Sequence, residues 1–293
     1  MATSPADEEV EAEAQQIAQS EEEASAPAPG VEAEEVARRA APPGVVVYEA
    51  IRQEGEDALK RRAAPLAFSG FAAGLSMGFS LVAEGLLRSY LPDLPWRPLV
   101  TKFGYSIGFL IVILARQQLF TENTLTAILP LLMRKNMPTL MRVLRLWGIV
   151  LAANLAGVAL FAFVVANSDT FQPQMREAFG AVGAEALAVT PGTAILRGIF
   201  AGWLIALMIW LLPYAETARV WVIIILSYLI GIGHLTHIVA GSAEVLYVAF
   251  TGAAGYGQVV AGYMLPTLLG NIVGGVALVA VLGHVQFMVH RET

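Results

Sequence analysis

Residues 116–123 read Arg116-Gln117-Gln118-Leu119-Phe120-Thr121-Glu122-Asn123, a polar stretch in the middle of an apolar sequence. A second polar stretch, residues 234–244, reads His234-Leu-Thr-His-Ile-Val-Ala-Gly-Ser-Ala-Glu244 and is also flanked by apolar residues. Polar or irregular backbone at membrane depth is tolerated only where protein buries it or where it lines a water-filled cavity. The two stretches therefore predict two membrane helices that are broken in mid-membrane, with a site between them.

The composition is that of a membrane protein. Of the 293 residues, 56% are hydrophobic and 14% are charged, and the mean hydropathy is +0.62. Soluble domains are about 45–50% apolar and about 25% charged, so a soluble globular class is excluded. The chain has no cysteine, which excludes a disulfide framework, a thiolate metal site and a cysteine nucleophile.

The beginning of the chain differs from the rest. Residues 1–44 are rich in Glu, Ala and Pro and account for most of the net charge of -6, which predicts a disordered acidic tail. They lack the basic start and apolar stretch of a signal peptide. Residues 45–64 predict an amphipathic interfacial helix, because Val47, Ile51, Ala58 and Leu59 share one stripe with basic residues beside it. Residues 65–293 are the predicted six-span transmembrane domain.

Six apolar stretches are long enough to cross a bilayer core, which takes about 20 helical residues. They lie at about 65–87, 100–133, 146–166, 191–213, 220–252 and 264–289. The second and fifth are too long for simple crossings and contain the two polar stretches. Lys and Arg are concentrated before the first stretch and after the second, which predicts that both termini lie in the cytoplasm.

The two halves of this domain contain similar sequence. Asn154-Leu-Ala-Gly157 in the third span matches Asn271-Ile-Val-Gly274 in the sixth. Because each half contributes three crossings, two copies must be inverted relative to each other. The predicted fold class is an all-α integral membrane protein with six transmembrane helices in two inverted three-helix repeats. Its second and fifth helices are broken, as in an aquaporin-like protomer.

Three short motifs occur in order in the matching spans. They are Leu119-Phe120-Thr121 in the second, His237-Ile-Val-Ala240 in the fifth, and Leu265-Pro-Thr-Leu-Leu-Gly-Asn-Ile-Val-Gly-Gly275 in the sixth. Together they resemble the formate/nitrite transporter family of pentameric anion channels, over roughly residues 66–291. The resemblance implies a homopentamer in a bacterial inner membrane that handles a small monovalent anion.

The same resemblance implies roles for individual residues. His237 corresponds to the central pore histidine, Thr121 to its partner in the loop, and Asn271 to a hydrogen-bonding neighbour. The residues that fall at the family's apolar constrictions are Leu119, Phe120, Tyr105, Phe109 and Ile230.

Several positions depart from the family pattern. Glycine replaces the usual asparagine at Gly241 and Gly202, and Glu122 follows Thr121 where a small residue is usual. Lys102 is a candidate for the family's outer-vestibule lysine. Glu122 is interpreted as a residue that gates by pH or as a partner of Arg116 or of loop amides. These departures are typical of the family's less characterised YfdC-like branch.

The chemistry of the motifs predicts a membrane channel for small monovalent anions or their conjugate weak acids. A bare anion in hydrocarbon is very costly, and even a partly buried one needs fixed donors. Imidazole titrates near neutral pH, so His237 is predicted to exchange a proton with a weak acid and let it cross nearly neutral. The alternative for His237 is a structural histidine that its neighbours satisfy.

Other classes fit the sequence less well. A neutral-solute or water pore of the aquaporin type would have Asn-Pro-Ala at its breaks, and neither break carries it. An intramembrane enzyme would show paired carboxylates, His-Glu metal spacing or a Gly-x-Ser-x-Gly turn, and none occurs. A membrane scaffold whose tail recruits a partner stays open. No cofactor, metal or nucleic-acid partner is expected, and lipid is the expected surroundings.

Overall fold

A computed structural model describes residues 44–276 of the chain. The predicted acidic tail up to residue 43 and the end of the predicted sixth span, residues 277–289, lie outside the described residues. Every regular element between residues 44 and 276 is a helix. In chain order the elements are α3 (Gly44–Lys60), α4 (Ala63–Tyr90), α5 (Arg97–Thr101), α6 (Ser106–Leu114), α7 (Phe120–Thr126), α8 (Ile128–Arg134), α9 (Met137–Asn167), α10 (Pro173–Leu187), α11 (Pro191–Leu211), α12 (Arg219–Ile232), α13 (Ala240–Phe250), the π-helical segment η1 (Gln258–Met264) and α14 (Leu265–Val273).

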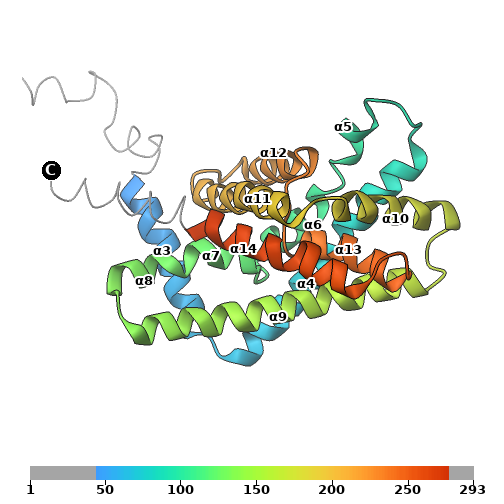
Figure 1. Cartoon of the computed structure of the whole chain (residues 1–293). Coiled ribbons are helices and arrows are strands. Elements are labelled where there is room, and N and C mark those ends of the chain that lie inside the picture. Colours follow the sequence, from blue (N-terminus) through green and yellow to red (C-terminus); the bar gives the residue numbers. More distant parts are fainter. Residues whose placement is uncertain (1–43, 277–293) are drawn as a thin grey trace, which may run out of the picture. The chain divides into compact units, whose positions relative to one another are not determined.

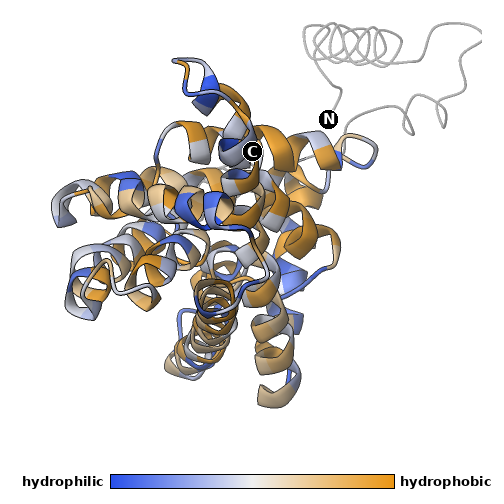
Figure 2. Ribbon diagram, turned by 90° about the vertical axis from the view of Figure 1, so that its right-hand side faces the viewer, coloured by the Kyte–Doolittle hydropathy of each residue, from blue (hydrophilic) through white to orange (hydrophobic). Residues whose placement is uncertain are grey.

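Helices α9, α10, α11 and α14 run beside one another (Figure 1), and hydrophobic residues make up much of the bundle (Figure 2). Within the described residues, five stretches are long and apolar enough to cross a membrane: Ala63–Tyr90, Arg97–Leu114, Met137–Asn167, Pro191–Leu211 and Gln258–Val276. The fifth predicted span is divided between two shorter apolar helices, α12 and α13. Exposed aromatic side chains such as Phe68, Phe163 and Trp221 suit a surface in contact with lipid.

Both predicted helix breaks are present. Helix α6 ends at Leu114 and α7 begins at Phe120, and α12 ends at Ile232 and α13 begins at Ala240. At each break the residue that turns the chain is left-handed, with φ of 53° at Arg116 and 48° at His234. A left-handed conformation costs a residue with a side chain about 1–2 kcal/mol. Two such residues at matching places show that the same backbone turn ends both half-helices.

Two asparagines hold the chain on either side of these breaks by the same three hydrogen bonds. The Asn154 amide nitrogen donates to the carbonyls of Gln118 (2.9 Å) and Gly70 (2.7 Å), and its oxygen accepts from the Phe120 amide (2.9 Å). Asn271 repeats this pattern. Its nitrogen donates to the carbonyls of Thr236 and Gly198 (both 2.9 Å), and its oxygen accepts from the Ile238 amide (2.8 Å). Backbone groups that the breaks free from helical bonding are thereby satisfied inside the protein.

Helix packing is also the same in the two halves. Helix α4 packs against α9, and α11 packs against α14. A methyl group on Gly74 would overlap the carbonyl of Asn154, and one on Gly202 would overlap the carbonyl of Asn271. The two helix pairs therefore approach as closely as only glycine permits.

Helix α10 was not predicted from the sequence, yet it matches α3. A methyl group on Gly55 of α3 would overlap the Thr126 carbonyl, and one on Gly183 of α10 would overlap the Glu244 carbonyl. Helix α3 lies beside α8 at one end of the bundle and α10 lies toward the other end (Figure 1). The stripe predicted for residues 45–64 is buried, because α3 packs it against α7, α8, α9 and α11.

Replacing Asn271 by leucine tests the contribution of these hydrogen bonds. Leu has a similar size but leaves two buried backbone groups of the break, the Thr236 carbonyl and the Ile238 amide, without the bonds that Asn271 makes to them, at about 1–3 kcal/mol for each group. We expect a large fall in the thermal unfolding midpoint of the purified protein in detergent. Asn167→Leu is the control, because Asn167 is exposed and its amide bonds only to the Phe163 carbonyl within the same helix. Equal midpoints for the two variants would contradict the importance of the asparagine.

A pair of glycine substitutions tests the helix contact. Gly202→Ala places a methyl group into the Asn271 backbone, and overpacking of this kind costs about 1–3 kcal/mol. Gly148→Ala on α9 meets no atom within 4 Å and gains helix propensity. We expect the first variant to unfold at a lower temperature than the wild type and the second at the same or a higher temperature. If Gly202→Ala is as stable as Gly148→Ala, the close approach of α11 and α14 is not required.

Candidate functional site

The two breaks meet at one contact. Thr121 Oγ1 at the start of α7 lies 2.8 Å from His237 Nε2 in the second break, and both residues are fully buried. The predicted approach of Thr121 to His237 is therefore confirmed. Their assignment to a pore stays a prediction.

The second nitrogen of the His237 ring fixes which nitrogen carries the proton. The Ala240 amide donates to His237 Nδ1 at 3.1 Å, so Nδ1 is an acceptor and carries no proton. In the neutral ring the proton is then on Nε2, which donates to Thr121 Oγ1. A doubly protonated ring would have to break the bond from Ala240.

Asn271 contributes to this site indirectly. It was predicted to be a hydrogen-bonding neighbour of His237, and its three bonds go to backbone atoms, two of them in the residues on either side of that histidine. Asn271 is thus a positioning residue. Asn154 was noticed in the sequence only as part of a repeat, and its spacing gave no sign of the same role.

Apolar side chains surround the contact. The Phe109 ring lies edge-on to the His237 ring, with centroids 5.1 Å apart, and Tyr105 packs on Phe109 at 5.5 Å. Phe120 turns instead toward Trp147 on α9, with centroids 5.8 Å apart. Leu119, which precedes Phe120, and Ile230, in the last turn of α12, are fully buried as well. All five predicted constriction residues are buried, but Phe120 packs against a different helix from Phe109.

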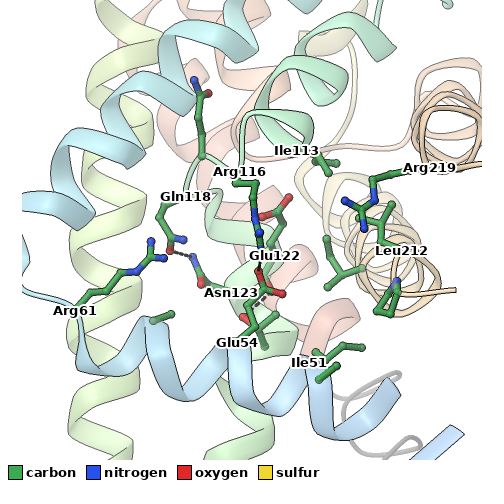
Figure 3. A pocket seen from close by; sticks show the side chains of 16 residues that line it. Ile51, Glu54, Arg61, Ile113, Arg116, Gln118, Glu122, Asn123, Leu212 and Arg219 are labelled. Carbon is green, nitrogen blue, oxygen red and sulfur yellow. Dashed lines mark hydrogen bonds and ion pairs between the residues drawn. The ribbon is translucent and has the colours of Figure 1, made fainter. Parts of the chain in front are cut away.

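A cavity of about 670 Å³ lies on the α3 side of the contact (Figure 3). We call it the α3 cavity. Its walls come from α3, the first break, α7, the end of α11 and the start of α12. The charged and polar residues in its lining include Glu54, Arg61, Arg116, Gln117, Glu122 and Arg219. Its mouth reaches solvent, since the side chains of Arg116 and Glu54 are 83% and 60% exposed.

Two further cavities, of about 40 Å³ and 610 Å³, lie beside the second break and α10. We call them the α10 cavities. Both are lined by Lys102, Glu185 and His234. Their walls include positions that match those of the α3 cavity, such as His234 for Arg116 and Thr236 for Gln118. Cavities therefore lie toward both sides of the Thr121–His237 contact, but the α10 cavity with the matching residues is much smaller than the α3 cavity, about 40 Å³ against about 670 Å³.

Lys102 lines the α10 cavities, where the sequence suggested a vestibule lysine. Its ammonium group forms a buried ion pair with Glu84 of α4. Arg197 and Glu244 line the smaller cavity with it. The vestibule role of Lys102 stays a prediction, and the charge of this lysine is balanced by Glu84, which the sequence did not associate with it.

Glu122 faces the α3 cavity. Its Oε1 is buried and accepts no hydrogen bond from any residue that the structure describes, and the same holds for Gln117 Oε1. The sequence suggested Arg116 as a partner for Glu122. Arg116 instead pairs with Glu54 of α3, at 3.8 Å (Figure 3).

Tyr263 fills the space that glycine leaves at position 241. A methyl group on Gly241 would overlap the Tyr263 hydroxyl and would lie 2.7 Å from the Tyr263 ring carbon Cζ. Tyr263 comes from η1, is buried, and lines the smaller α10 cavity. The sequence showed glycine at position 241 in place of the family's usual asparagine. It did not show that the side chain of a distant tyrosine lies in the space beside this glycine.

A double-mutant cycle tests this replacement. Gly241→Asn alone should destabilise the protein by about 1–3 kcal/mol or more, because the new side chain needs space that Tyr263 occupies. Adding Tyr263→Ala removes that obstacle, so the double variant should be more stable than the sum of the single changes predicts. Gly257→Asn, which meets no atom within 4 Å, should combine additively with Tyr263→Ala. Additive unfolding midpoints for the Gly241 pair would contradict the replacement.

Comparison with known proteins identifies the family of this chain. The profile of the family described as Formate/nitrite transporter matches residues 45–285. The chain is 43% identical to Inner membrane protein YfdC of Escherichia coli (strain K12) over 242 residues, which are 83% of this chain and 78% of that protein.

Two solved structures have a similar fold. One is a pentameric formate channel with formate bound, with a TM-score of 0.65 and 20% identity, covering 77% of this chain and 98% of that chain. The other is an FNT family ion channel, with a TM-score of 0.73 and 19% identity, covering 82% of this chain and 98% of that chain. Since the family profile covers most of the sequence and a relative is 43% identical over most of it, this protein belongs to the formate/nitrite transporter family.

Proposed function

We propose that this protein is a membrane channel for small monovalent anions, of the size of formate or nitrite, or for their conjugate weak acids. The observation that carries the proposal is the Thr121–His237 contact with a cavity on each side of it. The contact joins the two helix breaks, and helix breaks at a buried polar centre are typical of membrane transport sites. The solved formate channel with a similar fold, which has formate bound, supports the class of substrate.

The proposed architecture is six spans in two inverted repeats, with the path between the repeats as in an aquaporin-like protomer. The matching bonds of Asn154 and Asn271 support the duplication. The half-helices that follow the breaks support the inversion, because α8 packs with α3 and α13 packs with α10, toward opposite ends of the bundle.

His237 is the proposed pore centre, with Thr121 beside it and Asn271 holding the loop. The Nε2 proton of the neutral ring is a donor that a passing anion could accept in place of Thr121 Oγ1. Leu119, Phe120, Tyr105, Phe109 and Ile230 form the proposed apolar constrictions on either side. An apolar surround limits water, so only a solute that keeps a hydrogen bond or becomes neutral crosses readily.

The proposed assembly is a homopentamer in a bacterial inner membrane, with both termini in the cytoplasm. The pentameric channel with a similar fold supports the assembly, and the name of the YfdC protein supports the membrane. The distribution of Lys and Arg supports the orientation.

Flux measurements in proteoliposomes test the function. We expect passage of formate and nitrite, faster at lower pH, and no passage of glycerol. Purified His237→Asn should assemble and change ion selectivity, because the asparagine amide does not place its donor where the imidazole Nε2 proton lies. His234→Asn is the matched histidine control and should keep the pH dependence, since asparagine tolerates the left-handed backbone there. Glycerol flux without anion flux would favour a neutral-solute pore instead.

A further inference from the structure

We propose that Glu122 is a proton-exchanging site in the α3 cavity, where its protonated carboxyl group gives a proton to a weak-acid anion before the anion reaches His237. This inference rests on the proposed channel function and names the group that neutralises the substrate. Glu122 directly follows Thr121, the partner of His237, and its side chain lines the solvent-accessible α3 cavity. A group at this place meets the anion after it leaves bulk water and before it enters the apolar region.

The hydrogen bonding around Glu122 is that expected for a neutral carboxylic acid. Glu122 Oε1 and Gln117 Oε1 are both buried acceptors to which no residue between 44 and 276 donates, and both residues line the same cavity. An ionised carboxylate without donors or a counter-ion is expensive to bury. A proton on Glu122 removes that charge and adds an O–H donor to the wall that Glu122 shares with Gln117.

In the part of the chain that the structure describes, none of the charged groups around this cavity forms an ion pair with Glu122. These groups are Glu54 of α3, Arg61 directly after α3, Arg116 of the first break and Arg219 at the start of α12. Arg116 pairs with Glu54. Helix α7 also packs against α8, α9, α11 and α14, and the described parts of these helices bring no charged side chain to the cavity lining.

His237 is poorly placed to supply the proton itself. Its Nδ1 accepts the Ala240 amide and its Nε2 is bonded to Thr121, so a second proton would break an existing bond. The position in the second half that matches Glu122 is Ala240, which has no titratable group. The residue that matches Glu122 therefore offers no proton on the other side of the contact, where the carboxyl group in the lining of the smaller α10 cavity is Glu244, four residues further along the chain.

The exchange is balanced in protons and charge. The O–H bond of the Glu122 carboxyl breaks and an O–H bond forms on the anion, so a neutral acid and a Glu122 carboxylate result. The neutral acid passes the Thr121–His237 contact. The carboxylate takes a new proton from hydronium in the water of the α3 cavity, and the cycle moves one proton with each anion.

Proton and formate uptake measured together in proteoliposomes test the proposal. For the wild type we expect one proton per formate and a flux that does not respond to membrane potential. Glu122→Gln keeps the size and hydrogen bonding of the side chain but cannot release a proton. We expect its formate flux at acid pH to fall at least about tenfold, with the residual flux dependent on membrane potential.

Two further variants separate loss of chemistry from loss of structure. Glu122→Asp keeps a carboxyl group and should keep the one-to-one ratio, even if its rate changes. Glu54→Gln should also keep that ratio, because Glu54 is 60% exposed and paired with Arg116 and is not expected to exchange protons with the substrate. All variants are compared after size-exclusion chromatography shows the same assembly.

The outcomes distinguish this inference from the function on which it rests. If the wild type carries no anion, the proposed function itself fails. If the wild type carries formate but Glu122→Gln keeps its flux and its proton ratio, Glu122 is not the exchanging group. Loss of the proton ratio in Glu54→Gln, or in His237→Asn alone, would assign the exchange to that residue and overturn the proposal.

Discussion

The rest of the structure depends on two asparagine side chains that satisfy the backbone of two broken helices. A break in a membrane helix frees amide and carbonyl groups that cannot find water in hydrocarbon, and each unsatisfied group costs several kcal/mol. Asn154 and Asn271 each accept from one amide of a break and donate to one carbonyl of the same break, and each also donates to a carbonyl of the neighbouring helix, α4 or α11. Because the breaks are stable, Thr121 and His237 can meet inside the protein.

The two halves share a backbone frame but carry different chemistry at matching positions. Leu119 lies where the second half has His237, and Glu122 lies where it has Ala240. The helix contacts and the left-handed residues are equivalent in the two halves. Side chains make the cavities of the two halves different. Among the described residues, Glu122 in the α3 cavity has no ion pair, whereas Lys102 beside the α10 cavities pairs with Glu84, and Glu244 also lines the smaller of them.

The sequence predicted the features that depend on polarity and repetition. Polar residues in long apolar stretches located both breaks, and the motifs around Thr121 and His237 identified residues that prove to be in contact. Features that depend on contacts between side chains far apart in the sequence could not be predicted. Neither the pairing of Lys102 with Glu84 nor the tyrosine hydroxyl beside Gly241 follows from any local pattern. Helix α10 was not predicted because it is only partly apolar. Its similarity to α3 is a three-dimensional one: Gly183 of α10 and Gly55 of α3 each pack against a backbone carbonyl of the half-helices after the breaks.

The position of proton exchange determines whether an ion or a neutral acid must cross the proposed apolar constriction around the Thr121–His237 contact, which is called the narrow region here. If the proton were transferred at His237, an anion and an imidazolium would have to lie together among Phe109, Leu119 and other apolar side chains, and burying two charges costs several kcal/mol for each ion. Exchange at Glu122 takes place where water still reaches the anion. The narrow region then handles a neutral acid, for which one donor on His237 Nε2 is sufficient. An apolar constriction around a neutral histidine is therefore consistent with weak-acid permeation, provided that the proton is gained in the cavity before it.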